Sequence, residues 1–418
     1  MNNGIRGNPP NLNSVTYKTK QTALKKSLNS QNTFNSAEKW ERMAKASTGG
    51  AWDYDYTSCT FDGRYVYFTP FNSYYFNRYD STQSFTASSS WQQINLQTAQ
   101  GGAHSQNAYI GCTFDGRYIY FTAANSTTFI RYDNTLPFTA GASWQQIAVT
   151  SATGVTALAA GFSYWGCTFD GRYIYFAPSI SDTFIRYDST QAFNASNSWQ
   201  QMSMWSAQGA TAIDAAYFGC TFDGRYIYFT ASYSDTFIRY DTTQTFNASA
   251  SWQQVSIWSA QGGVALDQAY IGCTFDGRYV YFAPYGSATF VRYDSTQAFN
   301  ASNSWGQVAM QTAQGNTAVA NAYIGCTFDG RYIYFTASNS DTFIRYDTTA
   351  SFTTAASWQQ IAMSSGQGGA TVDNAYFGNG TFDGRYVYFP AYRSATLIRF
   401  LANNTGAKGP IEYARVSS

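Results

Sequence analysis

Residues 113–118 read Thr-Phe-Asp-Gly-Arg-Tyr, and this string decides the fold because it occurs seven times in the 418-residue chain. The phenylalanine of each copy lies at Phe61, Phe114, Phe169, Phe222, Phe275, Phe328 and Phe382. Successive copies are 53, 55, 53, 53, 53 and 54 residues apart. Because seven units of this size occupy nearly the whole chain, the repeat must define the architecture.

One unit, residues 108–150, predicts four strands. Residues 108–114 are rich in β-formers, Asp115-Gly116 is typical of a two-residue hairpin turn, and residues 117–122 form a second strand. A short turn leads to a third strand over residues 129–133, and a polar connection leads to a fourth over 144–149. Four-stranded units packed face to face around an axis form a β-propeller, so we expect an all-β, seven-bladed propeller with antiparallel blades.

The spacing within the unit predicts where its length can vary. A tryptophan lies 30 residues after the motif phenylalanine in six units, at Trp91, Trp144, Trp199, Trp252, Trp305 and Trp358. From each tryptophan to the next motif phenylalanine the distance varies between 23 and 25 residues. We therefore expect the segments after the fourth strands to be exposed loops on one face.

The seventh unit has no tryptophan 30 residues after its motif phenylalanine, Phe382, because Glu412 stands there. We therefore expect this unit to lack a fourth strand of its own. The N-terminal region supplies a substitute: Phe34 and Trp40 repeat the six-residue step that separates Phe193 from Trp199. We expect residues 34–46 to form the outer strand of the last blade and to close the ring. The predicted organisation is a basic arm over 1–33, a propeller over 34–407 and a tail over 408–418.

The repeat resembles the Asp-Gly-Arg-Tyr-Val/Ile-Tyr-Phe repeats of bacterial and phage β-propeller proteins, over about residues 34–407. The glycine-histidine signature of WD40 repeats is absent. The resemblance implies a lectin-like or adhesin-like propeller.

Charge divides the chain into two parts. Residues 1–37 contain five basic and no acidic side chains, whereas residues 46–407 contain 15 Arg, 21 Asp, no Lys and no Glu. We interpret the basic arm as an anchor to a larger assembly, and the acidic remainder argues against nucleic acid as a partner. No apolar run reaches the length of a membrane-spanning helix, and the N-terminus lacks the apolar core of a signal peptide. We expect a soluble protein that, if exported, leaves by another route.

The six cysteines recur at one position, two residues before the motif phenylalanine, at Cys59, Cys112, Cys167, Cys220, Cys273 and Cys326. Equivalent atoms of neighbouring blades should lie too far apart for disulfides. The seventh unit has Gly380 instead, which fits a need for small residues near the axis. We therefore expect six buried free thiols. We also expect no metal site, because the sole histidine, His104, lies in a variable loop.

The repeated aspartates favour architecture over catalysis. Asp-Gly suits a turn with positive φ, and the Arg-Tyr-Asp strings, such as Arg131 with Asp133, should form lateral or cross-strand ion pairs. Asp182, Asp235 and Asp341 lie in recurring Ser-Asp-Thr turns, for which a structural role is again favoured. No nucleophile-elbow, P-loop or HExxH motif is present, so we expect no enzymatic activity, no catalytic residue and no cofactor.

Aromatic residues in two sets of loops are the candidate ligand-binding residues: Trp205, Trp258, Tyr74, Tyr233 and Tyr285. Loops after the fourth strand should share a face with the turns between the second and third strands. Aromatic planes beside polar side chains suit sugar rings. The competing interpretation is packing within the protein, which we favour for Trp205 and Trp258 because both closely follow a fourth strand.

The preferred function is a non-enzymatic structural or adhesion protein of a virion, as a phage tail fibre or decoration protein, or of an extracellular surface. Residues 1–33 would contact other proteins of the assembly, and the loop face would bind a host surface or cell-surface glycans. The alternative is a free or secreted bacterial lectin. A structural spacer and a carbohydrate-active enzyme with two aspartates are further alternatives.

Overall fold

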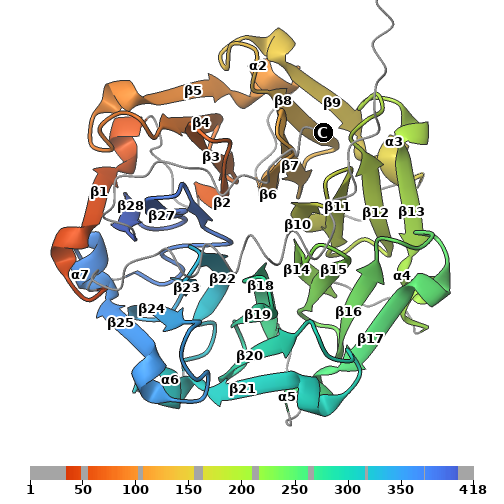
Figure 1. The fold of residues 1–418 in the computed structure, drawn as a ribbon. Coiled ribbons are helices and arrows are strands. Elements are labelled where there is room, and N and C mark those ends of the chain that lie inside the picture. Colours follow the sequence, from red (N-terminus) through yellow and green to blue (C-terminus); the bar gives the residue numbers. More distant parts are fainter. Residues whose placement is uncertain are drawn as a thin grey trace, which may run out of the picture.

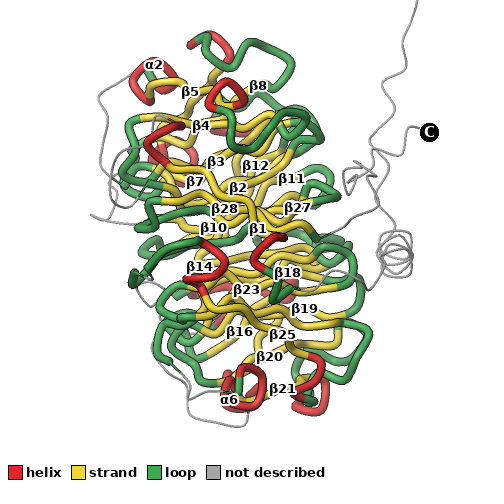
Figure 2. The backbone as a smooth tube through the Cα atoms, turned by 90° about the vertical axis from the view of Figure 1, so that its left-hand side faces the viewer, coloured by secondary structure: helices red, strands yellow, loops and turns green. Residues whose placement is uncertain are grey.

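The computed structural model describes residues 34–48, 55–101, 107–154, 163–209, 216–261, 268–315, 319–370 and 372–402. Within these ranges the strands form seven four-stranded antiparallel sheets arranged in a ring (Figure 1). The protein is therefore a seven-bladed β-propeller, as the repeat predicts. Seen edge-on, the ring is a disc with loops on both sides of the strands (Figure 2).

Each blade contains an inner, a second, a third and an outer strand. The inner strands are β2 (Tyr56–Phe61), β6 (Tyr109–Phe114), β10 (Tyr164–Phe169), β14 (Tyr217–Phe222), β18 (Tyr270–Phe275), β22 (Tyr323–Phe328) and β26 (Thr381–Phe382). The second strands are β3 (Tyr65–Pro70), β7 (Tyr118–Ala123), β11 (Tyr173–Pro178), β15 (Tyr226–Ala231), β19 (Tyr279–Pro284), β23 (Tyr332–Ala337) and β27 (Tyr386–Phe389). The third strands are β4 (Tyr75–Asp80), β8 (Thr128–Asp133), β12 (Thr183–Asp188), β16 (Thr236–Asp241), β20 (Thr289–Asp294), β24 (Thr342–Asp347) and β28 (Thr396–Leu401). The outer strands are β5 (Trp91–Asn95), β9 (Trp144–Ala148), β13 (Trp199–Ser203), β17 (Trp252–Ser256), β21 (Trp305–Ala309), β25 (Trp358–Ala362) and β1 (Trp40–Ala44).

Blades 1 to 6 follow the chain from β2–β5 to β22–β25, and blade 7 combines β26–β28 with β1. A five-residue helix follows the outer strand of blades 1 to 6, which the sequence did not predict. These helices are α2 (Leu96–Gln100), α3 (Val149–Thr153), α4 (Met204–Gln208), α5 (Ile257–Gln261), α6 (Met310–Gln314) and α7 (Met363–Gln367). None of the helices in the described ranges is long and apolar enough to cross a membrane.

The two ends of the propeller meet in blade 7. Strand β1 pairs antiparallel with β28, with Trp40 opposite Phe400 and Ala44 opposite Thr396. The predicted closure is confirmed: an N-terminal strand completes the last sheet (Figure 1). The predicted arm over 1–33 and tail over 408–418 lie outside the described residues.

The six-residue step from phenylalanine to tryptophan has a structural cause. The indole N–H of Trp40 donates a hydrogen bond to the carbonyl of Phe34 at 3.2 Å, across the 3₁₀ turn η1 (Ala37–Lys39). The equivalent bond from Trp144 to Phe138 measures 3.1 Å, and each remaining outer strand begins with the same bond. Because buried indole N–H groups need a partner, the step is a fixed part of the blade.

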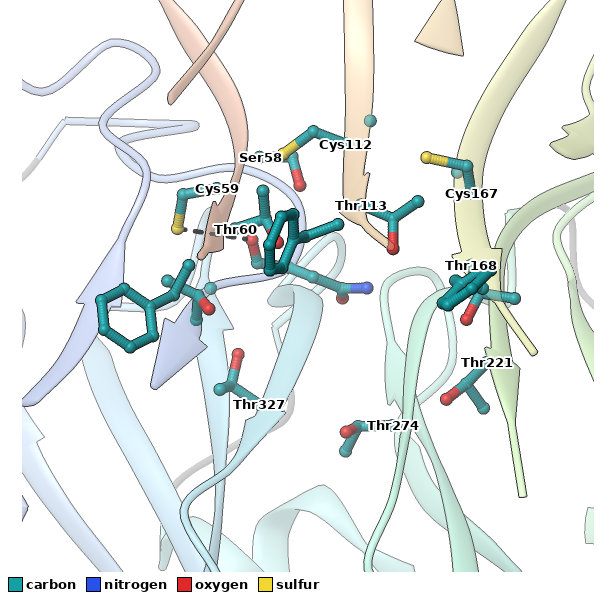
Figure 3. A pocket seen from close by; sticks show the side chains of 18 of the residues that line it. Ser58, Cys59, Thr60, Cys112, Thr113, Cys167, Thr168, Thr221, Thr274 and Thr327 are labelled. Atoms are coloured by element: carbon teal, nitrogen blue, oxygen red, sulfur yellow. Dashed lines mark hydrogen bonds between the residues drawn. The ribbon is translucent and has the colours of Figure 1, made fainter. Parts of the chain in front are cut away.

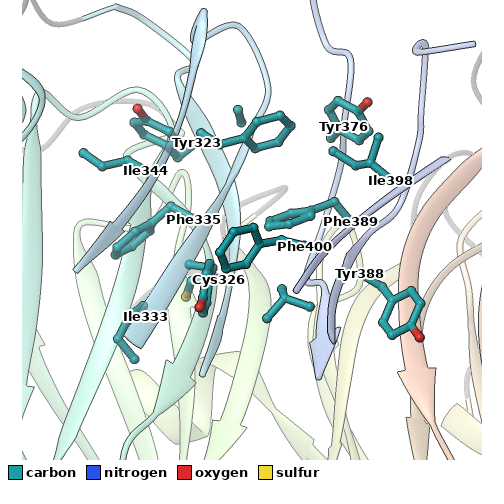
Figure 4. Packing of buried hydrophobic residues seen from close by; sticks show 14 of the residues in the cluster. Tyr323, Cys326, Ile333, Phe335, Ile344, Tyr376, Tyr388, Phe389, Ile398 and Phe400 are labelled. Atoms are coloured by element: carbon teal, nitrogen blue, oxygen red, sulfur yellow. The ribbon is translucent and has the colours of Figure 1, made fainter. Parts of the chain in front are cut away.

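Aromatic side chains fill the space between adjacent blades. The outer-strand tryptophan of one blade packs on the third-strand phenylalanine of the preceding blade, as in Trp144 on Phe76, with ring centroids 4.6 Å apart. Trp40 makes the same contact with Phe343 at 4.9 Å. Figure 4 shows the packing of blades 6 and 7, where Phe335, Phe389 and Phe400 are buried. Blade 7 is thus packed like the others although one strand comes from the other end of the chain.

The Asp-Gly motif forms a turn, but its central residues are Gly and Arg. Asp115 N–H donates to the Tyr118 carbonyl, and Gly116 has φ = 101°. One carboxylate oxygen of Asp115 accepts from the N–H groups of Arg117 and Tyr118, and the other accepts from the Tyr120 hydroxyl. The carboxylate thereby stabilises the turn, which supports the predicted architectural role of the motif aspartates.

The expected pairing of the Arg-Tyr-Asp strings is only partly right. Asp133 does form a cross-strand ion pair, at 2.7 Å, but its partner is Arg117 of the turn. Arg131 is buried instead and donates to Gln145 of the outer strand and to the Tyr187 hydroxyl of the next blade. The buried arginine therefore links neighbouring blades, because its guanidinium donates to both partners at once.

A ring of glycines brings the inner strands together around the axis. A Cβ atom at Gly325 would lie 2.0 Å from the carbonyl oxygen of Gly378 in blade 7, and one at Gly219 would lie 2.4 Å from that of Ile271. The small-residue requirement is thus met mainly by the residue before each cysteine. Gly380, at the cysteine position, is also crowded, because a Cβ there would lie 2.4 Å from the Tyr388 carbonyl oxygen.

Candidate binding face

The helices and the turns between second and third strands share one face of the disc, here called the helix face. The N–H of Leu96, the first residue of α2, donates a 2.8 Å hydrogen bond to the carbonyl of Tyr74 in such a turn. Equivalent bonds join the start of α3 to α7 to the turns of their own blades. The prediction that these two sets of loops share a face is confirmed. The Gly-Arg turns, which join the inner and second strands, lie on the opposite face, here called the turn face.

Trp205 in α4 and Trp258 in α5 are the most exposed large apolar side chains of the described residues, at 60% and 61%. The packing interpretation that we favoured for them is wrong. In both helices the residue before the tryptophan, Met204 or Ile257, is fully buried and fixes the helix to the blade. The tryptophan therefore points into solvent by virtue of its helical position.

Both tryptophans stand on well-anchored helices. The Ser203 side chain accepts a hydrogen bond from the Ser206 N–H at 3.2 Å, and Ser256 accepts from Ser259 at 3.1 Å, which caps each helix. Gln254 of the next blade donates to the Gln208 carbonyl at the end of α4. These bonds fix α4 at the boundary between blades 3 and 4.

An exposed aspartate lies in the turn that holds the start of each tryptophan-bearing helix. The carbonyl of Asp182 accepts from the N–H of Met204, and that of Asp235 accepts from the N–H of Ile257, both at 2.7 Å. Both aspartates are exposed. Each tryptophan thus follows a residue that is hydrogen-bonded to an aspartate of its own blade.

The three candidate tyrosines are not brought together with the tryptophans. Tyr74 is 38% exposed in its turn, whereas Tyr233 and Tyr285 are half-buried against an apolar cluster near the axis. Four of the five residues predicted as one aromatic surface therefore occupy two zones, and Tyr74 lies apart in a turn of blade 1. The tryptophans lie on the outer helices, and Tyr233 and Tyr285 lie nearer the centre.

The centre of the helix face holds an apolar cap that the sequence analysis missed. Trp165 stacks on Phe218 of the next blade, with centroids 4.1 Å apart and planes 6° apart, and lies 5.7 Å from Phe377 of blade 7. Since blades 3 and 7 are not neighbours, Trp165 reaches across the axis. The signal was present as a variable apolar residue after the first tyrosine of the inner strand, as at Ile110 and Ile271.

The axis contains a pocket of about 420 Å³ lined by inner-strand threonine, cysteine and phenylalanine side chains (Figure 3). All six cysteines are free. Four are buried and two, Cys112 and Cys167, are partly buried. Burial raises the pKa of every thiol, to about 12 for Cys112 and Cys273. Thiols of this kind are not nucleophiles near neutral pH.

Within the described ranges, no three His, Cys, Asp or Glu side chains gather closely enough to hold a metal ion. The motif aspartate Asp62 borders the pocket, but both its oxygens accept hydrogen bonds from its own hairpin. His104 lies outside the described residues.

Comparison with known proteins identifies the fold. No protein-family model matches the chain, and no curated protein matches it. The virginiamycin B lyase from Staphylococcus aureus is similar in structure, with a TM-score of 0.57 and 11% identity over 87% of this chain and 98% of that chain. The Cps50 (Swd1) β-propeller domain from Myceliophteria thermophila gives a TM-score of 0.53 at 9% identity, over 87% and 99% of the two chains. PorZ, a bacterial surface component of the type-IX secretion system of Porphyromonas gingivalis, gives 0.51 at 9% identity, over 90% and 39%. At these identities the likeness shows the fold alone.

Proposed function

We propose that this propeller is a non-enzymatic adhesion protein whose helix face binds glycans or another host surface. The observation that carries the proposal is the exposure of Trp205 and Trp258 at 60% and 61% on anchored helices. Each buried Å² of apolar surface stabilises by about 25 cal/mol. Two solvent-exposed indoles on a ring whose other aromatic side chains are mostly buried are therefore typical of a ligand-binding surface.

Sugars suit this surface for a chemical reason. The faces of a pyranose ring present C–H groups that pack on an indole, and its hydroxyls form hydrogen bonds with carboxylate and hydroxyl groups. Ser206 follows Trp205 in α4, and the carbonyl of Asp182 accepts from the N–H of the preceding Met204. Ser259 and Asp235 hold the same positions relative to Trp258. A glycan array with the intact protein and the double variant Trp205→Ala/Trp258→Ala tests the proposal. Binding lost in the double variant supports it, and a blank array contradicts it.

The absence of catalysis is part of the proposal. The axial pocket offers thiols with raised pKa and one motif aspartate, Asp62, whose oxygens are already hydrogen-bonded. Hydrolysis of a glycosidic bond needs two carboxylates, one on each side of the bond. Incubation of the protein with any glycan found on the array, followed by chromatography of the products, checks this point. Cleavage would contradict it.

We further propose that residues 1–33 anchor the ring to a virion, as part of a phage tail fibre or decoration, or to an extracellular surface. The support is the charge division, with five basic residues and no acid in residues 1–37 against an acidic body. Ring-shaped densities on imaged particles would support the virion assignment. Recovery of the protein only in free form, with glycan binding intact, would favour the alternative of a free or secreted lectin.

A further inference from the structure

The tryptophan and aspartate of blades 3 and 4 belong to a position that exists in every blade. It consists of the second helix residue and the turn residue whose carbonyl accepts the N–H of the first helix residue. In blade 3 these two residues are Trp205 and Asp182, and in blade 4 they are Trp258 and Asp235. We call each pair a rim platform.

The other blades carry different residues at the same position. The corresponding pairs are Gln97 with Tyr74, Thr150 with Thr127, Gln311 with Ala288, and Ser364 with Asp341. In blade 7 the position is taken by η2 (Lys45–Thr48), whose first N–H donates to the Ala395 carbonyl. Among the described blades, only blades 3 and 4 combine an indole with a carboxylate, and they are adjacent.

We propose that the two rim platforms bind one linear, neutral polysaccharide at the same time. This inference rests on the proposed glycan-binding function and deepens it by naming the ligand class. Because neighbouring blades are related by one step around the ring, the platforms present the same side chains in the same local geometry. A ligand that engages both must repeat its own structure along its length, as a polymer of one or two sugars does.

The charges of the two platforms and of the propeller favour a neutral polymer. Each platform has an exposed aspartate, and residues 46–407 carry 21 acidic against 15 basic side chains. No arginine or lysine lies in either helix or in the turn residues hydrogen-bonded to them. A sulfated or sialylated chain would therefore meet like charge at both platforms, whereas hydroxyl groups can donate to the aspartates.

Bivalent engagement makes a quantitative prediction. A polymer held at one platform presents the second sugar at high effective concentration, so its affinity exceeds that of one platform by a factor of about 10² or more. Loss of one tryptophan should then reduce polymer affinity by about that factor, although half of the sites remain. Independent platforms would instead keep the affinity and lose half of the binding capacity.

The experiment uses the full chain and four neutral polymers: dextran, mannan, galactan and a mixed-linkage β-glucan, with heparin as the anionic comparison. Titration calorimetry measures affinity and stoichiometry for the intact protein and for Trp205→Ala, Trp258→Ala and the double variant. Gln97→Ala, at the same position of α2, is the matched control and should bind like the intact protein. Oligosaccharides of increasing length, prepared from the polymer that binds, should show a step in affinity at the length that reaches from one rim platform to the other.

A gain-of-function variant provides an independent test. Gln311→Trp with Ala288→Asp builds a third platform next to blade 4, and it should raise polymer affinity without changing the affinity for a monosaccharide. Unchanged affinity with halved capacity in the single tryptophan variants would overturn the inference and leave the proposed function standing. Tighter binding of heparin than of all four neutral polymers would overturn the assigned ligand class. Failure of every glycan, including monosaccharides, would instead overturn the proposed function itself.

Discussion

The Arg399 guanidinium donates a 2.8 Å hydrogen bond to the Glu41 carboxylate, and the two residues face each other on the strands that close the ring. Arg399 is 5% exposed and also donates to the hydroxyls of Tyr79 and Tyr388. In blade 2 the same place is filled by Gln145, which accepts from Arg131. The closing strand thus replaces a neutral partner with a charged one at the same register position.

Replacing Glu41 with alanine should therefore destabilise the propeller. The variant leaves a buried guanidinium without one of its partners, which costs about 1–3 kcal/mol. Glu41→Gln is the matched control, because glutamine serves this purpose in blade 2, and it should lose less than half as much. Urea unfolding measures both changes. Equal losses in the two variants would mean that the ion pair, rather than the hydrogen bond, stabilises the seam.

Removal of the closing strand should have a much larger effect than removal of the arm. A chain that starts at residue 46 lacks Trp40, its bond to Phe34 and its packing on Phe343, and it exposes the edge of β28. We expect a fall in melting temperature and self-association through the free edge. A chain that starts at residue 34 keeps all these contacts and should melt like the full protein. Equal melting of all three chains would refute closure by β1.

The repeat spacing predicts the blades and their closure well because both depend on contacts within one unit. The step from Phe34 to Trp40 could be matched to that from Phe193 to Trp199 since one indole-to-carbonyl bond fixes each. Contacts between blades that are not neighbours cannot be predicted in this way. The apolar residue after the first inner-strand tyrosine marks the position of Trp165, but the repeat does not show that Trp165 reaches across the axis or that Trp205 points into solvent.

The five-residue helices could not be predicted for a related reason. A helix such as α4 is too short to show the 3.6-residue period, so the exposure of Trp205 had no signature. The sequence did not predict the partners of Arg131. Arg131 and Asp133 lie two residues apart on one strand and therefore share a face, which suggested an ion pair with an aspartate. The structure instead pairs Asp133 with Arg117 of the adjacent turn.

The glycine ring gives a third prediction. Gly325→Ala places a methyl group 2.0 Å from the Gly378 carbonyl oxygen, so the inner strands of blades 6 and 7 must move apart. Overpacking of this kind costs about 1–3 kcal/mol or more, and we expect a lower melting temperature. Gly369→Ala is the control, because no atom lies within 4 Å of its added methyl group. A normal melting temperature for Gly325→Ala would show that the strands separate freely.

The cysteines should be unreactive in the folded protein. Burial raises the pKa of Cys112 and Cys273 to about 12, so almost no thiolate exists at pH 8. We expect iodoacetamide to label none of the six cysteines in the native state and all six in urea, as read by intact mass. Cys112 and Cys167 are partly exposed and provide the most demanding test. Rapid native labelling at either residue would contradict the assignment of the thiols as structural.

Acid should weaken the ring through the aspartates that pair with the turn arginines. Burial alone would raise the pKa of Asp133, but hydrogen bonds from Arg117 and Thr135 outweigh it and hold the pKa below its ordinary value. Five equivalent aspartates have lowered pKa values in the same way. For a depressed folded-state pKa, the stabilisation is complete above the unfolded-state pKa of about 3.9 and is lost as the pH falls through the folded-state value.

The change in unfolding free energy between pH 6 and pH 3 should therefore be smaller in Asp133→Asn than in the intact protein. Asp170, the motif aspartate in the turn between β10 and β11, provides a control of opposite sign, because burial raises its pKa and acid then favours the folded state at this residue. Asp170→Asn removes that gain, so the free energy of unfolding of this variant should fall more steeply on acidification than that of the intact protein. Urea unfolding at several pH values measures all three slopes. If Asp133→Asn and Asp170→Asn change the slope in the same direction, the turn ion pair does not govern the acid response.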